Sequence, residues 1–315
     1  MPELRFRPFV ASDLPALAHA FAAAFHVPRS LEQWRHCMLD TEACGMLAFA
    51  ADDPTPLAFY GATVREASWC GQSIKVGQIV DVFSHPKARE AYPAVFVHNA
   101  QAFYAQFCGA GAIQMLYGYP SKGPWRQGER ALQYQRLQAP LWLQCLSDGR
   151  LGSQGLSMAG QVVKLVDLQL TALPQHKALC FADSSAYRQW RYPLSDSRYL
   201  GYGLHGIGEA RRLGELVFRL KGDTAYLLRW QLPDQALSGG FWLRVTRQLA
   251  NRGVARIQLM LAQQHPELAR LADLGFAGIA PVLPLIPCFR VFDAQLDTTA
   301  LQSAFYYSLA DTDLY

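Results

Sequence analysis

The stretch from Gly77 to Leu137 constrains the fold most, because apolar runs alternate there with breaks and amphipathic runs. The predicted elements are a strand at 77–83, a bend at 84–86, a basic turn at 87–89, a helix at 92–107, a strand at 112–118, a break at 119–121 and a short helix. A strand that leads through a basic turn into a helix places amide groups and positive charge at a helix N-terminus. Such a site suits a pyrophosphate.

Composition indicates a globular chain without a strong charge preference. The 315 residues are 51% hydrophobic and 17% charged, which suffices for one large domain or two ordinary ones. The net charge is only +4, and no long basic run occurs. We therefore expect no nucleic-acid partner, although a local basic patch for a phosphate is compatible with this balance.

Cysteine usage and the N-terminal sequence favour a cytoplasmic protein. The seven cysteines are dispersed without Cys-x-x-Cys spacing, which is typical of buried thiols in a reducing compartment. The first residues contain no apolar signal core, and no run approaches the length of a membrane span. No pair of histidines has the spacing of metal ligands, so we expect no metal and no membrane partner.

The first part of the chain predicts a small sheet preceded by two helices. Asp13 is expected to cap the first helix. The expected elements are a strand at 4–10, helices at 14–25 and 31–39, a hairpin of strands 45–51 and 56–67 around Asp52-Asp53-Pro54, and further strands at 69–76 and 77–83.

The second part predicts a second pass through a similar order of elements. Residues 147–160 are rich in Gly and Ser and lack periodicity, so they are the best linker candidate. The expected later elements are strands at 199–206, 213–221 and 224–231, a helix at 240–251, a strand at 255–261 and a helix at 266–274.

Three short motifs resemble the cofactor-binding half of the GCN5-related N-acetyltransferase (GNAT) family. They are Asp81-Val-Phe-Ser-His-Pro86, Arg89-Glu-Ala-Tyr92 and Tyr117-Gly-Tyr-Pro-Ser121, and the two outer ones match well. Gln189-Trp-Arg-Tyr192 and Asp273-Leu-Gly-Phe276 are similar to the second half of tandem GNAT proteins. The resemblance implies an α/β (α+β) chain of two tandem GNAT-like domains, each a mixed, mostly antiparallel sheet flanked by helices. Their expected bounds are 1–146 and 161–315, and the second domain is expected to be degenerate.

The middle motif departs from the family pattern at its turn. Tyr92 stands where the family has a key glycine, and Pro93 has no N–H to offer a phosphate. Proline nevertheless suits the first turn of a helix. Two interpretations stay open: coenzyme A binds with fewer backbone contacts, helped by Lys87 and Arg89, or this half has lost the cofactor.

The resemblance implies positions for the cofactor acetyl-CoA, or another acyl-CoA, along the strand end and the turn. These are Val82, Phe83, Ser84, Lys87, Arg89, Ala91, Tyr92, Ala94 and Ser121. A backbone N–H near Val82 or Phe83 would stabilise the oxyanion.

Four side chains are candidates for the chemistry. Asp81 would be a base or would bind an ammonium group; the alternative is that it only fixes a turn or a partner. His85 would be a base or would stabilise its Ser-His-Pro turn. The family's tyrosine proton donor falls at Trp125 here, which leaves Tyr117, Tyr119 and Tyr134 as substitutes, each more often a packing residue than a catalyst; Tyr117 and Tyr119 are the catalytic candidates.

The acceptor pocket is expected to involve aromatic residues from both ends of the chain. The candidates are Phe25, Trp34, Trp125 and Tyr315. The resemblance also raises the hypothesis that the C-terminal carboxylate acts as a base. An aromatic face would favour a cationic or sugar-like acceptor.

Together these patterns lead to an acyl-CoA-dependent N-acyltransferase acting on a small amine or amino sugar. The alternative is a non-catalytic ligand-binding or scaffolding protein on the same fold. A third hypothesis, transfer from a bulkier donor or an aminoacyl-tRNA, is disfavoured by the mild charge. A homodimer stays open.

Overall fold

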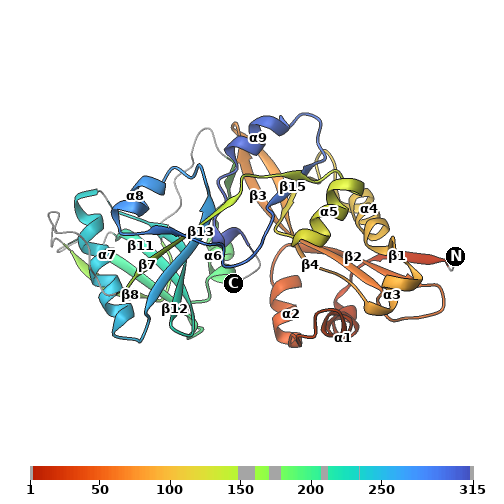
Figure 1. Cartoon of the computed structure of the whole chain (residues 1–315), viewed down its shortest axis with the longest axis horizontal. Coiled ribbons are helices and arrows are strands. Elements are labelled where there is room, and N and C mark those ends of the chain that lie inside the picture. The colour runs from red at the N-terminus through yellow and green to blue at the C-terminus, as the bar shows by residue number, and fades with distance from the viewer. Residues whose placement is uncertain (1–2, 148–159, 170–178, 207–211, 234, 313–315) are drawn as a thin grey trace. The chain divides into compact units, whose positions relative to one another are not determined.

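The structure is a computed structural model, and it describes residues 3–147, 160–169, 179–206, 212–233 and 235–312. The chain divides into two compact units (Figure 1). Unit 1 comprises Met1–Leu137, Gln175–Ala182 and Pro284–Phe305, and unit 2 comprises Gln138–Pro174, Asp183–Leu283 and Tyr306–Tyr315. No helix within the described ranges is long and apolar enough to cross a membrane.

Unit 1 is built on a mixed sheet in the order β1-β2-β3-β4-β5-β15-β6, with β9 added to β3. All its neighbours pair antiparallel except β4 and β5, which run parallel. Its strands are β1 (Leu4–Pro8), β2 (Ala43–Ala50), β3 (Ala58–Trp69), β4 (Gln72–Ser84), β5 (Ile113–Gly118), β6 (Gln135–Arg136), β9 (Cys180–Phe181) and β15 (Cys288–Val291). Its helices are α1 (Leu14–Phe25), α2 (Leu31–Met38), α3 (Pro86–Ala91), α4 (Val95–Phe107), α5 (Lys122–Ala131) and α9 (Thr298–Ala304).

Unit 2 repeats this plan with a sheet in the order β14-β7-β13-β12-β11-β10-β8, in which only β12 and β13 are parallel. Its strands are β7 (Pro140–Leu146), β8 (Gln161–Leu165), β10 (Tyr199–His205), β11 (Arg212–Lys221), β12 (Thr224–Gln231), β13 (Arg256–Ala262) and β14 (Ala277–Ile279). Its helices are α6 (Ser185–Arg191), α7 (Gln235–Ala250) and α8 (Leu268–Asp273). The predicted fold class is therefore confirmed.

Each unit contains a strand that is far in the sequence from the strands with which it pairs. β7 precedes the linker candidate but pairs with β13 and β14 of unit 2, whereas β15 comes late in the chain and pairs with β5 of unit 1. This division differs from the contiguous bounds 1–146 and 161–315 expected from the sequence. Most of the linker candidate, residues 148–159, lies outside the described residues.

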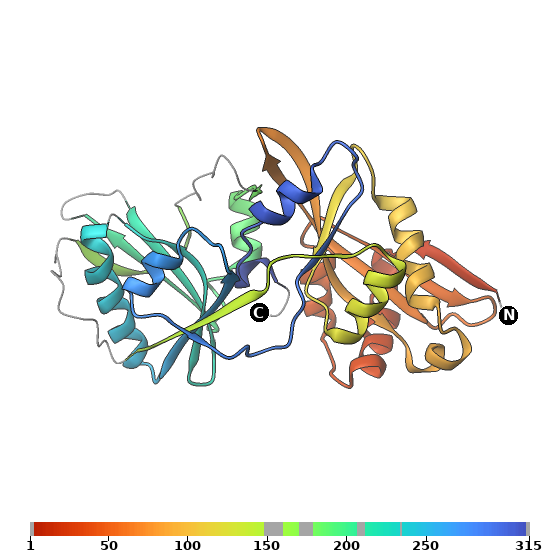
Figure 2. The ribbon, with the colours of Figure 1, turned by 45° about the horizontal axis from the view of Figure 1, so that its top comes forward.

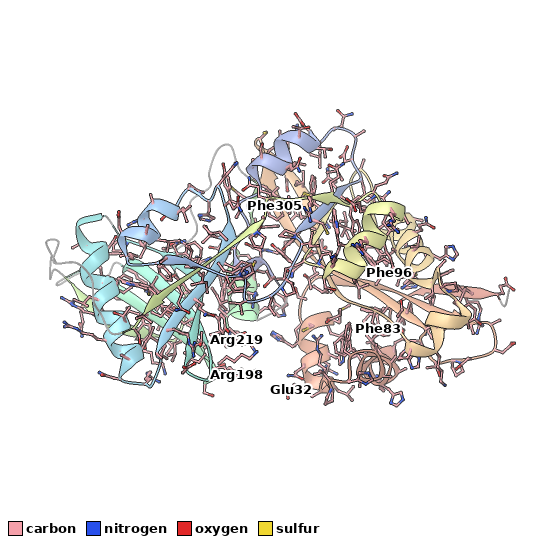
Figure 3. The ribbon with its side chains drawn as sticks, viewed as in Figure 1. Glu32, Phe83, Phe96, Arg198, Arg219 and Phe305 are labelled. Atoms are coloured by element: carbon pink, nitrogen blue, oxygen red, sulfur yellow. The ribbon has the colours of Figure 1, made fainter. Side chains whose placement is uncertain are left out.

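The two faces of the unit 1 sheet carry different cores. Leu47, Phe59 and Phe83 pack on one face against α1 and α2. Tyr60, Ala62 and Leu116 pack on the other face, in the core that includes residues of α4 and α5. Side chains alternate between faces along a strand, so neighbours such as Phe59 and Tyr60 belong to different cores. Figure 3 shows Phe83 on the side of α1 and Phe96 on the side of α4.

Local signals explain the first two helices. The buried residues of α1 recur at helical spacing. His26, the residue that follows α1, has a left-handed backbone with a φ of 58° and ends the helix. Ser30 and Gln33 form a capping box at the start of α2. Asp13 does not cap α1 as expected. Its carboxylate instead accepts from the Val10 amide and pairs with Arg7.

Three predicted element bounds were wrong. The strands expected at 69–76 and 77–83 are one strand, β4, because Cys70 and Gly71 both have positive φ and form the hairpin turn. The helix expected at 92–107 begins at Val95, because the basic turn is itself the short helix α3. The helix expected at 240–251 begins at Gln235, since burial of Phe241 and Trp242 offsets the low helix propensity of the glycines before them.

Candidate functional site

The parallel strands β4 and β5 of unit 1 separate partway along their length. Their pairing runs from Lys75–Ile113 to Gln78–Tyr117, and in the described chain it goes no further. β4 continues to Ser84, while β5 ends at Gly118 and the chain turns into α5. Beyond Gln78, the backbone of β4 on that edge therefore has no partner strand within the described chain.

A bulge marks β4 just beyond the separation. Phe59 pairs with Phe83 and Gly61 with Val80, so Tyr60 faces both Asp81 and Val82. Asp81 has a φ of 55°, an unusual conformation for a residue other than glycine. Bulges of this kind redirect side chains and occur next to active sites.

Asp81 is buried in an ion pair on the α1–α2 side of the sheet. Its Oδ1 lies 2.7 Å from Nη1 of Arg29, and its side chain is only 6% exposed. Burial raises the pKa of this carboxyl, and the neighbouring guanidinium opposes the rise. The Arg29 guanidinium also lies 4.9 Å from the centre of the Phe21 ring and 4.7 Å from that of Trp34. Arg29 was not among the site residues expected from the sequence, where the readable signal next to it was Ser30, the cap of α2.

His85 caps the short helix α3. Its Nδ1 accepts a hydrogen bond from the Lys87 amide at 3.2 Å, and its own amide donates to the Leu57 carbonyl. Burial lowers the pKa of this imidazole, and Lys87 lowers it further. These contacts are those of a turn residue, one of its two expected roles. Its role as a base stays a prediction.

The start of α4 offers open amide groups. Ala94 precedes this 13-residue helix and has no side chain to cap it. The amides of Ala94, Phe96 and Val97 have no hydrogen-bond acceptor in the part of the chain that the structure describes, whereas the Val95 amide donates to the Tyr92 carbonyl. Uncapped amides at a helix N-terminus are suited to an anion. The sequence missed these donors because it placed the helix start at Tyr92.

The other predicted cofactor positions surround this turn and the strand end. Tyr92 and Phe83 are buried, and Phe83 packs against Phe21. The side chain of Arg89 lies outside the described residues. Val82, Ser84 and Ala94 are half-buried, and Lys87, Ala91 and Ser121 are exposed.

Tyr117 and Tyr119 are both buried beside the point of separation. Their ring centres lie 6.1 Å apart in an edge-to-face arrangement, and the Tyr117 hydroxyl donates to Gln78 Oε1 at 3.4 Å. Tyr117 also packs edge-to-face against Phe305. The two phenols are thus brought together, and the choice between catalysis and packing stays open.

The predicted pocket residues occupy different environments. Trp34 is fully buried under Arg29, whereas Phe25 is 48% exposed at the end of α1. Trp125 is buried in the α4–α5 core, with the Arg136 guanidinium 5.6 Å from its ring centre. Tyr315 lies outside the described residues. A shared pocket of these four residues therefore stays a prediction.

Three tyrosine hydroxyls meet in that same core. Tyr60 is 2.7 Å from the Tyr134 hydroxyl and 3.1 Å from that of Tyr104, and the latter two are 3.3 Å apart. Burial raises the pKa of all three phenols, so they stay neutral donors and acceptors. Gly128 of α5 makes room for this cluster, since a Cβ there would lie 2.0 Å from the Tyr134 ring.

We expect Gly128→Ala to lower the free energy of unfolding by about 1–3 kcal/mol, because the Tyr134 ring must move and the hydroxyl cluster with it. Urea denaturation measures this change. Gly123→Ala is the matched control on the same helix, since nothing lies within 4 Å of the Cβ it would add. A loss no larger than in the control would contradict this packing.

Unit 2 repeats the separation but not the basic turn. Within the described residues, β12 pairs with β13 only from Thr224–Arg256 to Tyr226–Gln258. The register of β11 and β12 shifts after Val217. Next to the start of α7, Arg270 donates to the Pro233 carbonyl and to the Ser238 hydroxyl. The expectation that this half is degenerate stays a prediction.

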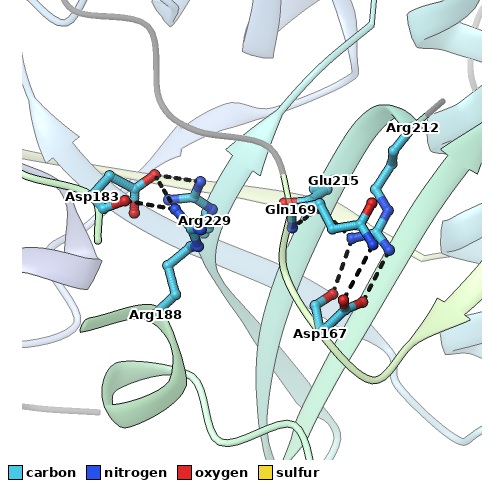
Figure 4. Close-up of polar contacts among 7 residues, drawn as sticks. All are labelled: Asp167, Gln169, Asp183, Arg188, Arg212, Glu215 and Arg229. Carbon is cyan, nitrogen blue, oxygen red and sulfur yellow. Dashed lines mark hydrogen bonds and ion pairs between the residues drawn. The ribbon is translucent and has the colours of Figure 1, made fainter. Parts of the chain in front are cut away.

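Charged residues of unit 2 form two clusters, in which all side chains except that of Asp167 are largely buried (Figure 4). Arg212 pairs with Glu215 and with Asp167, and the Gln169 amide donates to Glu215 at 2.6 Å. In the other cluster, Asp183 lies between Arg188 and Arg229. Within the described residues, no group of three or more His, Cys, Asp or Glu is arranged to hold a metal ion.

Solved structures share this arrangement. A GCN5-related N-acetyltransferase from Kribbella flavida matches 93% of the chain over 73% of its own length, with a TM-score of 0.62 and 12% identity. Another, from Anabaena variabilis, matches 91% over 73% of its own length, with a TM-score of 0.63 and 12% identity. A tandem GNAT protein from the clavulanic acid biosynthesis pathway matches 92% of the chain over 98% of its own length, with a TM-score of 0.55 and 13% identity.

This chain has the tandem GNAT fold. The third match decides it, because one tandem GNAT protein is covered over almost its whole length by the two units together. No family model matches the sequence, and no curated protein matches it. At such identities the tandem GNAT fold is what the likeness establishes. Activity has to be argued from the site.

Proposed function

We propose that the chain is an N-acyltransferase that moves an acyl group from coenzyme A, acetyl in the first instance, to a small amine or amino sugar. The separation of β4 and β5 beside the Asp81 bulge carries this proposal. An open strand edge there suits the amide-bearing pantetheine arm, and the uncapped start of α4 suits the phosphates. The tandem GNAT protein of the clavulanic acid pathway is described in a form without AcCoA, which is consistent with this donor.

Different groups of unit 1 would take part in the transfer. The thioester supplies an activated acyl carbon; the C–N bond forms as the C–S bond breaks, and the amine proton leaves. An amide of Val82 or Phe83 would donate to the carbonyl oxygen, where negative charge develops. The hydroxyl of Tyr117 or Tyr119 would donate a proton to the departing sulfur.

Asp81 then has a positioning role. Because its carboxylate is held by Arg29, it is not a free base, and the pair presents polar groups on an otherwise aromatic face. An acceptor amine is expected to approach from that face and to lose its proton to solvent or to His85.

Calorimetric titration tests the donor assignment. We expect acetyl-CoA to bind about tenfold more tightly than S-acetylpantetheine, because only the former has phosphates for the α4 amides. Lys87→Glu/Arg89→Glu is expected to remove that difference. Arg247→Glu, an exposed helical arginine of unit 2, is the matched control. Folded protein that binds neither compound would refute the proposal.

A non-catalytic ligand-binding role is the second candidate. Two observations favour it: Trp125, at the position of the family's tyrosine donor, is buried in the core, and Asp81 is engaged by Arg29. Under this alternative the protein binds acetyl-CoA but acylates no member of a panel of amines and amino sugars. Turnover of any acceptor, measured as released thiol, would exclude it.

A further inference from the structure

Helix α5 carries a stripe of exposed cations. Lys122, Arg126 and Arg130 recur every four residues, all three are exposed, and none has a carboxylate partner within the described ranges. Two other cations of the same unit do have one: Arg7 pairs with Asp13, and Lys75 with Glu42. We call Lys122, Arg126 and Arg130 the basic stripe.

Helix stability does not explain the basic stripe as a whole, although Arg130 lies in the last turn of α5, where the helix dipole favours a cation. Like charges four residues apart on a helix repel each other. Lys122 is the first residue of α5, the end at which the helix dipole disfavours a cation. The opposite face of α5 holds Trp125 and Gly128 in the core, so the stripe faces solvent. A row of exposed like charges without carboxylate partners suits an anionic partner.

The basic stripe begins beside the open edge of β4. β5 ends at Gly118, and only three residues separate it from Lys122. α5 lies next to α4, whose start holds the uncapped amides (Figure 2). A partner on the stripe therefore has its contact surface close to the place where a thioester arm would enter.

The turn before α4 is better matched to one phosphate than to the pyrophosphate and the ribose phosphate of coenzyme A. The Lys87 amide already donates to His85, and Pro93 has no amide to offer. The amides of Ala94, Phe96 and Val97 are what the described chain offers at the turn. A phosphopantetheine arm carried by a protein has a single phosphate and no nucleotide.

We propose that the basic stripe docks a small acidic protein that carries the acyl group on a phosphopantetheine arm. The inference rests on the proposed function, since the arm enters between β4 and β5 as the arm of coenzyme A would. Contacts of the carrier with the basic stripe would add to the few phosphate contacts that the turn offers. Acidic carrier and basic stripe attract each other, so binding depends on salt.

The test compares donors on the full chain. The probes are a fatty-acid acyl carrier protein in its acetyl-phosphopantetheine form, the same protein without the arm, and acetyl-CoA. We expect the acetyl carrier to bind more tightly than the bare carrier and to weaken with added NaCl. Arg126→Glu/Arg130→Glu should weaken carrier binding about tenfold and leave acetyl-CoA binding unchanged. Arg247→Glu should alter neither.

The outcomes separate this inference from the proposed function. Binding of acetyl-CoA without binding of the acetyl carrier would overturn the docking and leave the function. Loss of acetyl-CoA binding in the double variant would assign the stripe to the nucleotide and also overturn the docking. Tighter binding of bulk RNA than of the carrier would overturn it too. Equal binding of bare and acetyl carrier, lost in the double variant, would keep the docking surface and count against acyl transfer.

Discussion

Arg29→Met is expected to lower the free energy of unfolding of unit 1 by about 3–5 kcal/mol at neutral pH, because it leaves the Asp81 carboxylate buried without its cation. Hydrogen exchange of peptides covering β4 resolves this loss from the behaviour of unit 2. The control is Arg7→Met. Arg7 pairs with Asp13 over the same 2.7 Å, but its side chain is 46% exposed, so we expect a loss below about 1 kcal/mol.

The loss in Arg29→Met should depend on pH with a definite sign. Burial raises the pKa of Asp81 above its ordinary value of 3.8, so the folded protein holds this proton more tightly than the unfolded chain does. The stability contributed by the group is present at low pH and is lost as the pH rises through the folded pKa. Without Arg29 the pKa rises further, and the deficit should grow from acid to neutral pH.

Arg29→Met/Asp81→Asn provides the check, since it has no carboxyl to titrate. Its deficit relative to the native chain should be smaller at neutral pH and nearly flat across the acid range. A deficit in the single variant that is equally flat, or as small as that of Arg7→Met, would show that the Arg29–Asp81 pair does not control the charge state of this strand.

Arg212→Met is expected to destabilise unit 2 by about 3–5 kcal/mol, because Glu215 has no exposed surface and loses the guanidinium that pairs with it. Protection of β11 amides against hydrogen exchange should fall accordingly. The same variant removes the bonds from Arg212 to the Asp167 carbonyl and carboxylate, so the segment after β8 should also lose protection.

Two further variants make this second result decisive. Arg256→Met removes a 2.6 Å pair with Asp223 in which both side chains are about half exposed, so it should cost less than about 1 kcal/mol. Arg212→Met/Glu215→Gln removes both charges and should recover part of the loss. Equal losses in Arg212→Met and Arg256→Met would contradict the importance of burial.

The sequence predicted most elements but not their register at the site. The hydrophobic pattern placed β1 to β3, β5 and β10 to β13 to within a few residues, because alternation follows directly from one buried face, but it did not predict β6 to β9, β14 or β15. It could not show that Asp81 adopts a positive φ, since the bulge arises from unequal pairing with β3. It also could not pair Arg29 with Asp81, which are 52 residues apart and meet only in the folded sheet.

The positions of the candidate residues along the chain were readable from the motifs, but their contacts were not. Asp81 lies near the end of β4, His85 follows that strand, and Tyr117 lies opposite Gln78 where β4 and β5 separate. Their partners were not predictable, because each contact is made by a residue from another element or by a backbone group. The open amides of Ala94, Phe96 and Val97 illustrate this, since a helix start shifted by three residues changes which amides are free.

The exchanged strands β7 and β15 bear on how the chain acquires its structure during synthesis. Residues 1–146 can emerge from the ribosome long before residues 288–291, so the sheet of unit 1 stays without β15 next to β5 until those later residues are made. β7 in turn waits for β13, about 110 residues later. Neither unit is thus formed by one continuous segment. A cut after residue 146 would separate β15 from the sheet of unit 1 and β7 from the sheet of unit 2, and each of these strands would remain on a fragment without its partners.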